Sequence, residues 1–106
     1  MISEIKDNYI YLKPDYKEKK SFTSLILSSD YSTDIILDLS SLEIIDESFF
    51  YSLNQINKYI VSKGFCLVII LKEALSTTHI ENLNIVPTLI EGLDYIQIEQ
   101  IQRHLG

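Results

Sequence analysis

The chain has 106 residues, of which 46% are hydrophobic and 23% are charged, a composition that indicates a globular protein and excludes wholesale disorder. This length is near the commonest domain size and predicts a single domain, residues 1–106. Nine lysines and arginines against fifteen aspartates and glutamates give a formal net charge of −6. Such a surface would repel a phosphate backbone, so we expect no nucleic-acid partner.

The first residues lack the pattern of a secretory signal, and no apolar run reaches membrane-spanning length. We therefore expect a cytoplasmic protein that does not engage a membrane. The single cysteine, Cys66, excludes an internal disulfide, and its place in an apolar run favours a buried packing residue over a nucleophile. With His79 and His104 as the only histidines, no zinc-ligand spacing exists, and we expect neither a metal nor a cofactor.

Two β-favouring segments at the N-terminus flank the turn-forming pair at residues 7–8 and predict a hairpin. The apolar residues of its strands are Ile2, Ile5, Tyr9, Tyr11 and Leu12. Pro14 ends the second strand because it has no amide hydrogen to donate. Residues 21–29 then predict a short helix. Its expected buried side chains are Phe22, Leu25 and Ile26.

The apolar run within residues 34–39 predicts a strand covered on both faces. A helix over residues 47–62 follows, with Asp46 as its N-terminal cap and Glu47 as a favourable negative charge in its first turn. Two overlapping sets of residues have the spacing of one helical face. The first is Phe49, Leu53, Ile56 and Ile60, and the second is Phe50, Leu53, Asn57 and Ile60. Only the first set is wholly apolar.

The lysine and glycine at residues 63–64 end this helix, and the apolar residues 65–71 predict a second buried strand. Strand, helix and strand in this order imply a parallel crossover. Asp38, at the end of the first of these strands, either bonds to the connection that enters the helix or lies at a solvated strand end. Residues 78–81 have the form of a capping box and predict one or two helical turns.

Residues 85–86 predict a short strand that Pro87 cuts off. A second capping box at residues 88–91 begins a helix that extends to residue 105. Its apolar residues are Leu89, Leu93 and Ile96, then Ile98, Ile101 and Leu105. Their phase shifts near Gln97, which marks either a bend or a stop. The tail from residue 98 either packs on its own sheet or pairs with a second copy of the chain.

This order of elements predicts an α/β fold, a mixed sheet built from an N-terminal hairpin and parallel strands, with helices packed against it. Nucleophilic catalysis needs a base oriented toward the nucleophile, but His79 and His104 lie in a polar loop and a terminal helix. The chain has neither a Gly-x-Ser-x-Gly elbow nor a glycine-rich phosphate loop. We therefore expect that the protein is not an enzyme.

The segment IILDLSSLEIIDESFFYSL at residues 35–53 is similar, without gaps, to a known family pattern. That pattern runs from three hydrophobic residues and Asp-Leu-Ser to Asp-Ser-Ser-Gly-Leu and a leucine three positions later. It belongs to STAS domains, the fold of bacterial anti-sigma-factor antagonists and of the cytoplasmic tails of sulfate transporters. Residues 63–68 resemble the family's glycine and following strand, and residues 85–93 resemble its closing strand, Pro-Thr turn and last helix. The resemblance covers residues 34–96 and implies a STAS-like fold.

In antagonists of this family, a partner that is both kinase and anti-sigma factor phosphorylates the first serine of Asp-Ser-Ser-Gly-Leu, and the phosphate breaks the complex. The matching positions here are Asp46, Glu47, Ser48, Phe49 and Phe50. The resemblance therefore places Glu47, which cannot be phosphorylated, at the acceptor position. Its single negative charge imitates the ~1.5 to 2 charges of phosphoserine only in part. Alternatively, Glu47 only stabilises the first helical turn, by roughly 0.3–1 kcal/mol, which is the simpler interpretation.

We expect another protein as the partner, such as an anti-sigma-factor-like kinase or a regulatory protein. The expected partner-binding residues are Asp46, Glu47, Ser48, Phe49, Tyr51 and Ser52. Both alternative faces of the helix stay open, and of the two we expect Phe49 to be partly exposed in this surface and Phe50 to belong to the core. Ser48 is better explained as a hydroxyl at a helix start than as a displaced phosphorylation site.

Two alternatives stay open. One is a small-ligand or nucleotide sensor, which concave apolar space between the hairpin and helix 47–62 would favour. The other is a structural subunit that forms a homodimer through its C-terminal helix.

Overall fold

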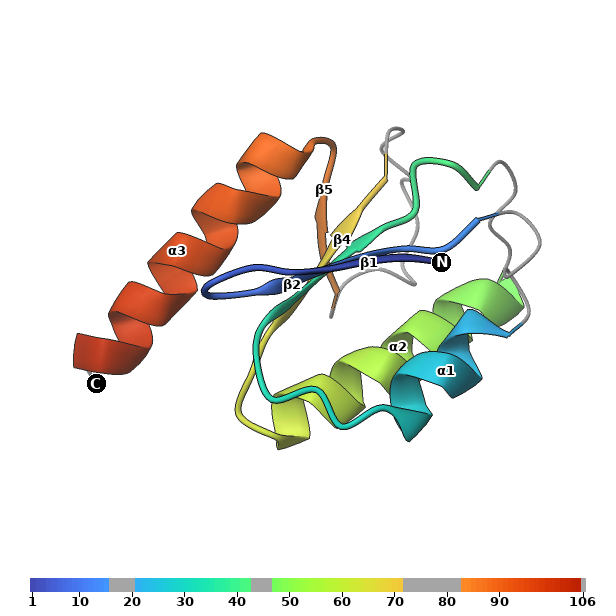
Figure 1. Ribbon diagram of the computed structural model, residues 1–106, viewed down its shortest axis with the longest axis horizontal. Coiled ribbons are helices and arrows are strands. Elements are labelled where there is room, and N and C mark those ends of the chain that lie inside the picture. The colour runs from blue at the N-terminus through green and yellow to red at the C-terminus, as the bar shows by residue number, and fades with distance from the viewer. Residues whose placement is uncertain (16–20, 43–46, 72–82, 106) are drawn as a thin grey trace.

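The computed structural model describes residues 1–15, 21–42, 47–71 and 83–105, which form a five-stranded mixed sheet with helices on both faces (Figure 1). The hairpin consists of strands β1 (Ile2–Ile5) and β2 (Ile10–Lys13), which pair antiparallel. Strand β2 and strands β3 (Ile35–Asp38), β4 (Leu67–Ile70) and β5 (Asn84–Val86) pair in parallel, in chain order. The predicted hairpin, mixed sheet and parallel crossover are confirmed.

Helices α1 (Phe22–Ser28) and α2 (Glu47–Ser62) cover one face of the sheet, and α3 (Leu89–Leu105) lies on the other (Figure 1). Because successive strand residues point to opposite faces, the core has two parts. In β3, Ile35 and Leu37 pack in the larger part, under α1 and α2, whereas Ile36 packs in the part under α3. Coverage on both faces explains why β3 and β4 are buried along their whole length.

The short helix α1 buries Phe22 and Ile26, as predicted, but Leu25 is 45% exposed. The expectation that Leu25 is buried was therefore wrong. The helix has only seven residues, and Phe22 and Ile26, one turn apart, occupy the side that faces the core.

The end of α2 follows the predicted pattern. Gly64 has a φ of +88°, the left-handed conformation that glycine adopts without strain. Its N–H donates to the Val61 carbonyl oxygen at 2.9 Å, and the Phe65 N–H donates to the Ile60 oxygen at 3.2 Å. The Lys63 ammonium donates to the Asp30 carboxylate at 2.9 Å, so the helix end is also tied to the segment before β3. The two backbone bonds satisfy carbonyl groups that the helix itself leaves without partners.

Helix α3 continues without interruption through Gln97 and follows a straight course in Figure 1, so neither the predicted stop nor the predicted bend occurs. The phase shift instead changes which residues face the sheet. Ile96 is buried against the sheet, whereas the later apolar residues are at least half exposed. These residues are Ile98, Ile101 and Leu105. Packing of the tail's apolar residues on its own sheet, one of the two expectations, is therefore wrong.

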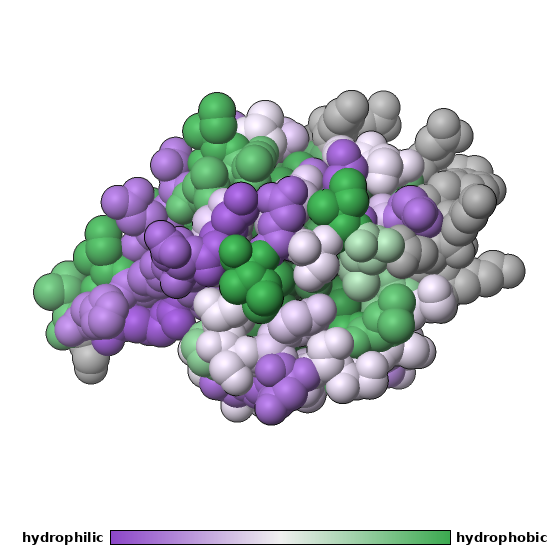
Figure 2. All heavy atoms as spheres, viewed as in Figure 1, coloured by the Kyte–Doolittle hydropathy of each residue, from purple (hydrophilic) through white to green (hydrophobic). Residues whose placement is uncertain are grey.

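Figure 2 shows hydrophobic side chains along the outer margin of α3, separated by polar ones. Near the start of the same helix, Gly92 lies close to the sheet, where a Cβ would be 3.5 Å from a Val68 methyl and 3.6 Å from a Val86 methyl. The helix is thus held closely to β4 and β5 at its start.

The turns predicted at residues 78–81 lie outside the described residues. Among the residues that are described, no helix is long and apolar enough to cross a membrane.

Cys66 is buried just before β4, as predicted, and burial together with the neighbouring Asp34 raises the pKa of its thiol to about 12. The thiol is therefore neutral near pH 8, and the reactive thiolate is scarce. We expect Cys66 in the native protein to react with an alkylating reagent at a small fraction of its rate in urea-unfolded chain. Time-resolved mass spectrometry measures both rates. Equal rates would show that the site is open to solvent.

Candidate partner-binding site at the start of helix α2

The approach to α2 is anchored at Asp38, the last residue of β3. Its carboxylate accepts a hydrogen bond from the Ser40 backbone N–H at 2.9 Å and another from the Tyr11 hydroxyl. Of the two expectations for Asp38, the bond to the connection is confirmed, and the solvated strand end is wrong because the residue is buried.

Burial alone would raise the pKa of the Asp38 carboxyl, but the hydrogen bonds from Ser40 and Tyr11 outweigh burial and lower it. Burial and the bond to Asp38 raise the pKa of the Tyr11 phenol. At neutral pH the pair is therefore a carboxylate that accepts and a phenol that donates. This bond joins the neighbouring strands β2 and β3.

The next residues of the connection are also held in place. The Ser41 hydroxyl donates to the Pro14 carbonyl oxygen at 3.1 Å, and the Leu42 N–H donates to the Leu39 oxygen at 3.0 Å. Leu42 is buried in the larger core. Residues 43–46 lie outside the described residues, so the predicted cap at Asp46 stays a prediction.

Helix α2 begins at Glu47, as predicted, and its first turns present polar and aromatic groups to solvent. Ser48 is exposed, Ser52 is half-buried, and Tyr51 is 66% exposed. The Ser52 hydroxyl donates to the Ser48 carbonyl oxygen at 3.2 Å. Because residues three and four apart are neighbours on a helix, these three side chains form one patch. The patch offers hydroxyl groups and an aromatic ring with a polar tip to a partner.

Phe49 does not belong to this patch. It is 5% exposed, and its ring centroid lies 5.2 Å from that of Phe22 in α1. The expectation of partial exposure was wrong because α1 packs alongside α2 and covers a second strip of its surface. Phe50 is buried as expected, so α2 buries residues of both alternative faces. These are Phe49, Phe50, Leu53, Ile56 and Ile60.

Concave apolar space between the hairpin and α2 would favour the ligand-sensor alternative, which stays a prediction. The described apolar side chains of this region belong to the larger core cluster. Ile10 and Leu12 of β2 are buried in the same cluster as Phe22 and Ile26 of α1. Among the described residues, no group of histidine, cysteine or acidic side chains could hold a metal ion.

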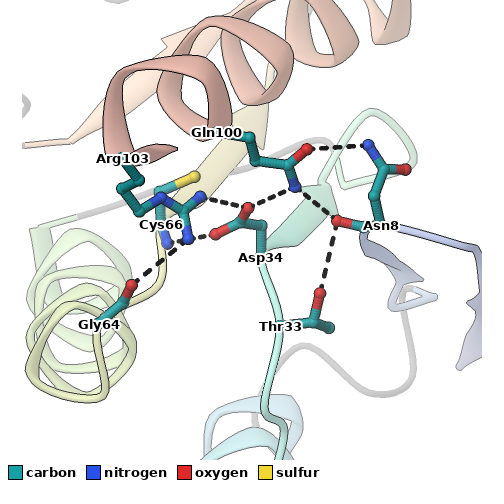
Figure 3. A network of polar contacts seen from close by, with 7 residues as sticks. All are labelled: Asn8, Thr33, Asp34, Gly64, Cys66, Gln100 and Arg103. Atoms are coloured by element: carbon teal, nitrogen blue, oxygen red, sulfur yellow. Dashed lines mark hydrogen bonds and ion pairs between the residues drawn. The ribbon is translucent and has the colours of Figure 1, made fainter. Parts of the chain in front are cut away.

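A second polar cluster, which no sequence motif indicated, lies at the opposite end of the strands (Figure 3). Asp34 is 1% exposed, and its carboxylate accepts hydrogen bonds from the Cys66 N–H at 2.9 Å and the Gln100 amide at 2.8 Å. Arg103 donates to the same carboxylate and forms an ion pair with it. The Gln100 amide also donates to the Asn8 carbonyl oxygen at 2.8 Å. These bonds attach the C-terminal half of α3 to the hairpin turn and to the start of β3.

Burial alone would raise the pKa of Asp34, but the hydrogen bonds from Cys66, Arg103 and Gln100 outweigh burial and lower it. The cluster is a fully partnered buried carboxylate, and we assign it a structural role.

No protein-family model matches the sequence, and no curated protein matches it closely enough to be a relative. Solved structures do match. A proposed anti-sigma factor antagonist from Thermotoga maritima aligns with a TM-score of 0.68 and 20% identity, over 91% of this chain and 93% of that chain. A chain from the structure of the stressosome, a signal integration and transduction hub, aligns with a TM-score of 0.70 and 18% identity, over 93% of this chain and 98% of that chain.

A serine-to-glutamate variant of RsbS from Moorella thermoacetica aligns with a TM-score of 0.67 and 19% identity, over 93% of this chain and 96% of that chain. At this level of identity the likeness establishes the fold. The protein therefore has the STAS-like α/β fold of its anti-sigma factor antagonist and stressosome neighbours.

Proposed function

We propose that this protein is a regulatory module that acts by binding another protein and does not act as an enzyme. The observation that carries the proposal is the fold, because its neighbours are regulatory STAS proteins whose alignments cover at least nine-tenths of this chain. The proposed contact surface is the start of α2. Its residues are Asp46, Glu47, Ser48, Tyr51 and Ser52.

Two features of this surface support a protein contact. Tyr51 is largely exposed on the first turns of a helix, and tyrosine is enriched at protein interfaces. Earlier in the chain, the bonds at Asp38, Ser41 and Leu42 hold the start of the connection that leads to α2, which favours a preorganised surface.

We further propose that Glu47 keeps the module in a single state, because a carboxylate cannot gain a phosphate. Two observations support this proposal. Glu47 is the first residue of α2, at the position where the resemblance places the acceptor serine. The RsbS neighbour itself carries a glutamate in place of a serine, so the fold accommodates such a change.

The chain provides a matched control for Glu47. Glu91 is also an acidic residue in the first turn of a helix, and its backbone N–H donates to the Thr88 hydroxyl at 3.3 Å. Glu47→Ser and Glu91→Ser each remove one favourable charge from a helix start, at a cost of roughly 0.3–1 kcal/mol. Their effects on stability should therefore be similar, while only Glu47 lies in the proposed contact surface.

The test is affinity capture from the organism's own cell extract with wild type, Glu47→Ser, Tyr51→Ala and Glu91→Ser. We expect Glu47→Ser and Tyr51→Ala to change the set or the amount of captured proteins, and Glu91→Ser to match wild type. Identical capture by all four proteins would remove the start of α2 as the contact surface. Thermal unfolding of each variant checks that the comparison is made between folded proteins.

A further inference from the structure

The outer edge of strand β1 is exposed along its whole length. The strand ends the sheet, and none of the described residues pairs with its outer side. All four residues of β1 are exposed, including Ile5 at 83%. An edge strand presents backbone N–H and C=O groups to which another strand can pair.

The hairpin register shows which backbone groups point outward. The Lys6 N–H donates to the Tyr9 oxygen at 2.9 Å, so Lys6 and Tyr9 form a hydrogen-bonded pair. In an antiparallel ladder such pairs alternate with pairs that exchange no hydrogen bond. Ile5 and Ile10 are therefore a pair without mutual hydrogen bonds, consistent with the Ile10 N–H donating to Asp34 in the direction of β3. It follows that the N–H and C=O of Ile5 point away from the sheet.

The side chains next to Ile5 have opposite charges. Glu4 and Lys6 lie on the same face of the strand, and their side chains form an ion pair at 3.1 Å. Both side chains are about half exposed, at 51% and 46%. The order along the edge is therefore acid, isoleucine, base. In an antiparallel second copy the order runs the other way, so each acid faces a base.

We propose that two copies of this chain pair through antiparallel β1 strands centred on Ile5. Ile5 of each copy donates its N–H to the Ile5 carbonyl oxygen of the other, which forms two backbone hydrogen bonds. In this register Glu4 of each copy lies opposite Lys6 of the other. The two sheets then form one continuous sheet across a two-fold axis, and the pairing closes on itself without growing into a fibre.

The charges set the register of this pairing. A shift by one residue would point side chains to the wrong face. A shift that centres the pair on Glu4 would place the two Glu4 carboxylates directly opposite each other, which is destabilising. The contact is small, so we expect a weak, concentration-dependent dimer. This pairing does not depend on the partner proposed for the start of α2, because it uses only the edge of the sheet at β1.

Charge reversal tests the proposal. Lys6→Glu puts a second carboxylate opposite Glu4 of the other copy, and Glu4→Lys puts two ammonium groups opposite each other. Each variant therefore has two repulsive cross-strand pairs in the symmetric dimer, and its dimer dissociation constant should rise about tenfold or more. The double exchange Glu4→Lys with Lys6→Glu restores complementary pairs and should restore the wild-type constant.

Mixing the two single variants gives the sharpest result. One chain then presents only lysines at this edge and the other only glutamates, so a heterodimer should form more readily than either homodimer. Native mass spectrometry and sedimentation equilibrium over a concentration series measure these species. Lys58→Glu and Glu91→Lys make the same charge changes at exposed helix positions and should leave the dimer unchanged.

Three outcomes would overturn the proposal. These are a wild-type chain that stays monomeric over the whole series, a Lys6→Glu dimer as stable as wild type, and a mixture that forms no heterodimer. A dimer lost only in Ile98→Lys would assign the association to α3 and would equally exclude β1. Circular dichroism of each variant confirms that its fold is retained.

Discussion

Replacing Phe49 by alanine is expected to lower the free energy of unfolding by about 3–5 kcal/mol, the range for a buried phenylalanine in a packed core. The side chain is buried between α1 and α2 and packs near the Phe22 ring, so the shorter residue would leave a cavity beneath the start of α2. Urea unfolding followed by circular dichroism measures the change. The urea concentration at the midpoint and the slope of the unfolding free energy against urea concentration should be compared together. A changed slope would indicate an altered denatured state.

Tyr51→Ala is the matched control, since it also removes an aromatic ring from the first turns of α2, but from the exposed side. We expect it to change stability by less than about 0.5 kcal/mol, as is usual for a surface position. Equal effects of the two substitutions would contradict the burial of Phe49 and would return it to the contact surface. Comparing the two variants thus separates the contribution of core packing beneath α2 from that of its exposed surface.

Local sequence signals account for the bounds of the main elements. A cap residue, an acid in the first turn and a closing lysine and glycine predicted a helix over residues 47–62, and α2 spans those residues. Likewise, two β-favouring segments around residues 7–8 were sufficient for the hairpin. These features depend on neighbours within a few positions along the chain, which a sequence displays directly.

Several expectations that failed concern which side of a helix is covered, and this depends on elements far away in the sequence. Phe49 is buried because α1 packs beside α2, and no pattern within α2 reveals that neighbour. Strand length explains the exposed tail of α3. A helix of 17 residues is about 25 Å long, whereas strands of three or four residues span ~10–13 Å, so the last turns extend beyond the sheet.

For the proposed contact surface, the expected exposure of Ser48 and Tyr51 agrees with the structure. No comparable sequence signal indicated that Asp34 is buried and bonded to distant residues. Its partners Cys66 and Arg103 lie 32 and 69 residues away, and Arg103 in a last helical turn is already explained by the helix dipole. An aspartate directly before a buried strand is the only local sign, and a solvated strand end would explain it equally well.

Arg103→Ala is expected to lower the free energy of unfolding by about 1–3 kcal/mol at pH 7, because it leaves a buried carboxylate without its cation. Asp34 would keep the hydrogen bonds from Cys66 and Gln100, so the loss should be partial. Arg103→Lys retains a charge but not the planar group that donates to both Asp34 and the Gly64 oxygen, so its stability should fall between wild type and Arg103→Ala. Lys58→Ala, which removes an exposed cation from α2, is the control and should have little effect.

The effect of Arg103→Ala should depend on pH in a definite direction. The pKa of Asp34 is lowered by folding, so its contribution is fully present above the unfolded value of about 3.9 and is lost as the pH falls through the folded value. Once the carboxyl is protonated in both proteins, Arg103 has no charge to neutralise. Arg103 is one of the groups that lower this pKa, so the Asp34 carboxyl of the variant takes up its proton at a higher pH than that of wild type. The difference in unfolding free energy between wild type and Arg103→Ala should therefore shrink as the pH falls from 7 through these two folded pKa values, while that of Lys58→Ala stays small. A difference that stayed constant over this range would show that Arg103 stabilises the protein through packing and not through Asp34.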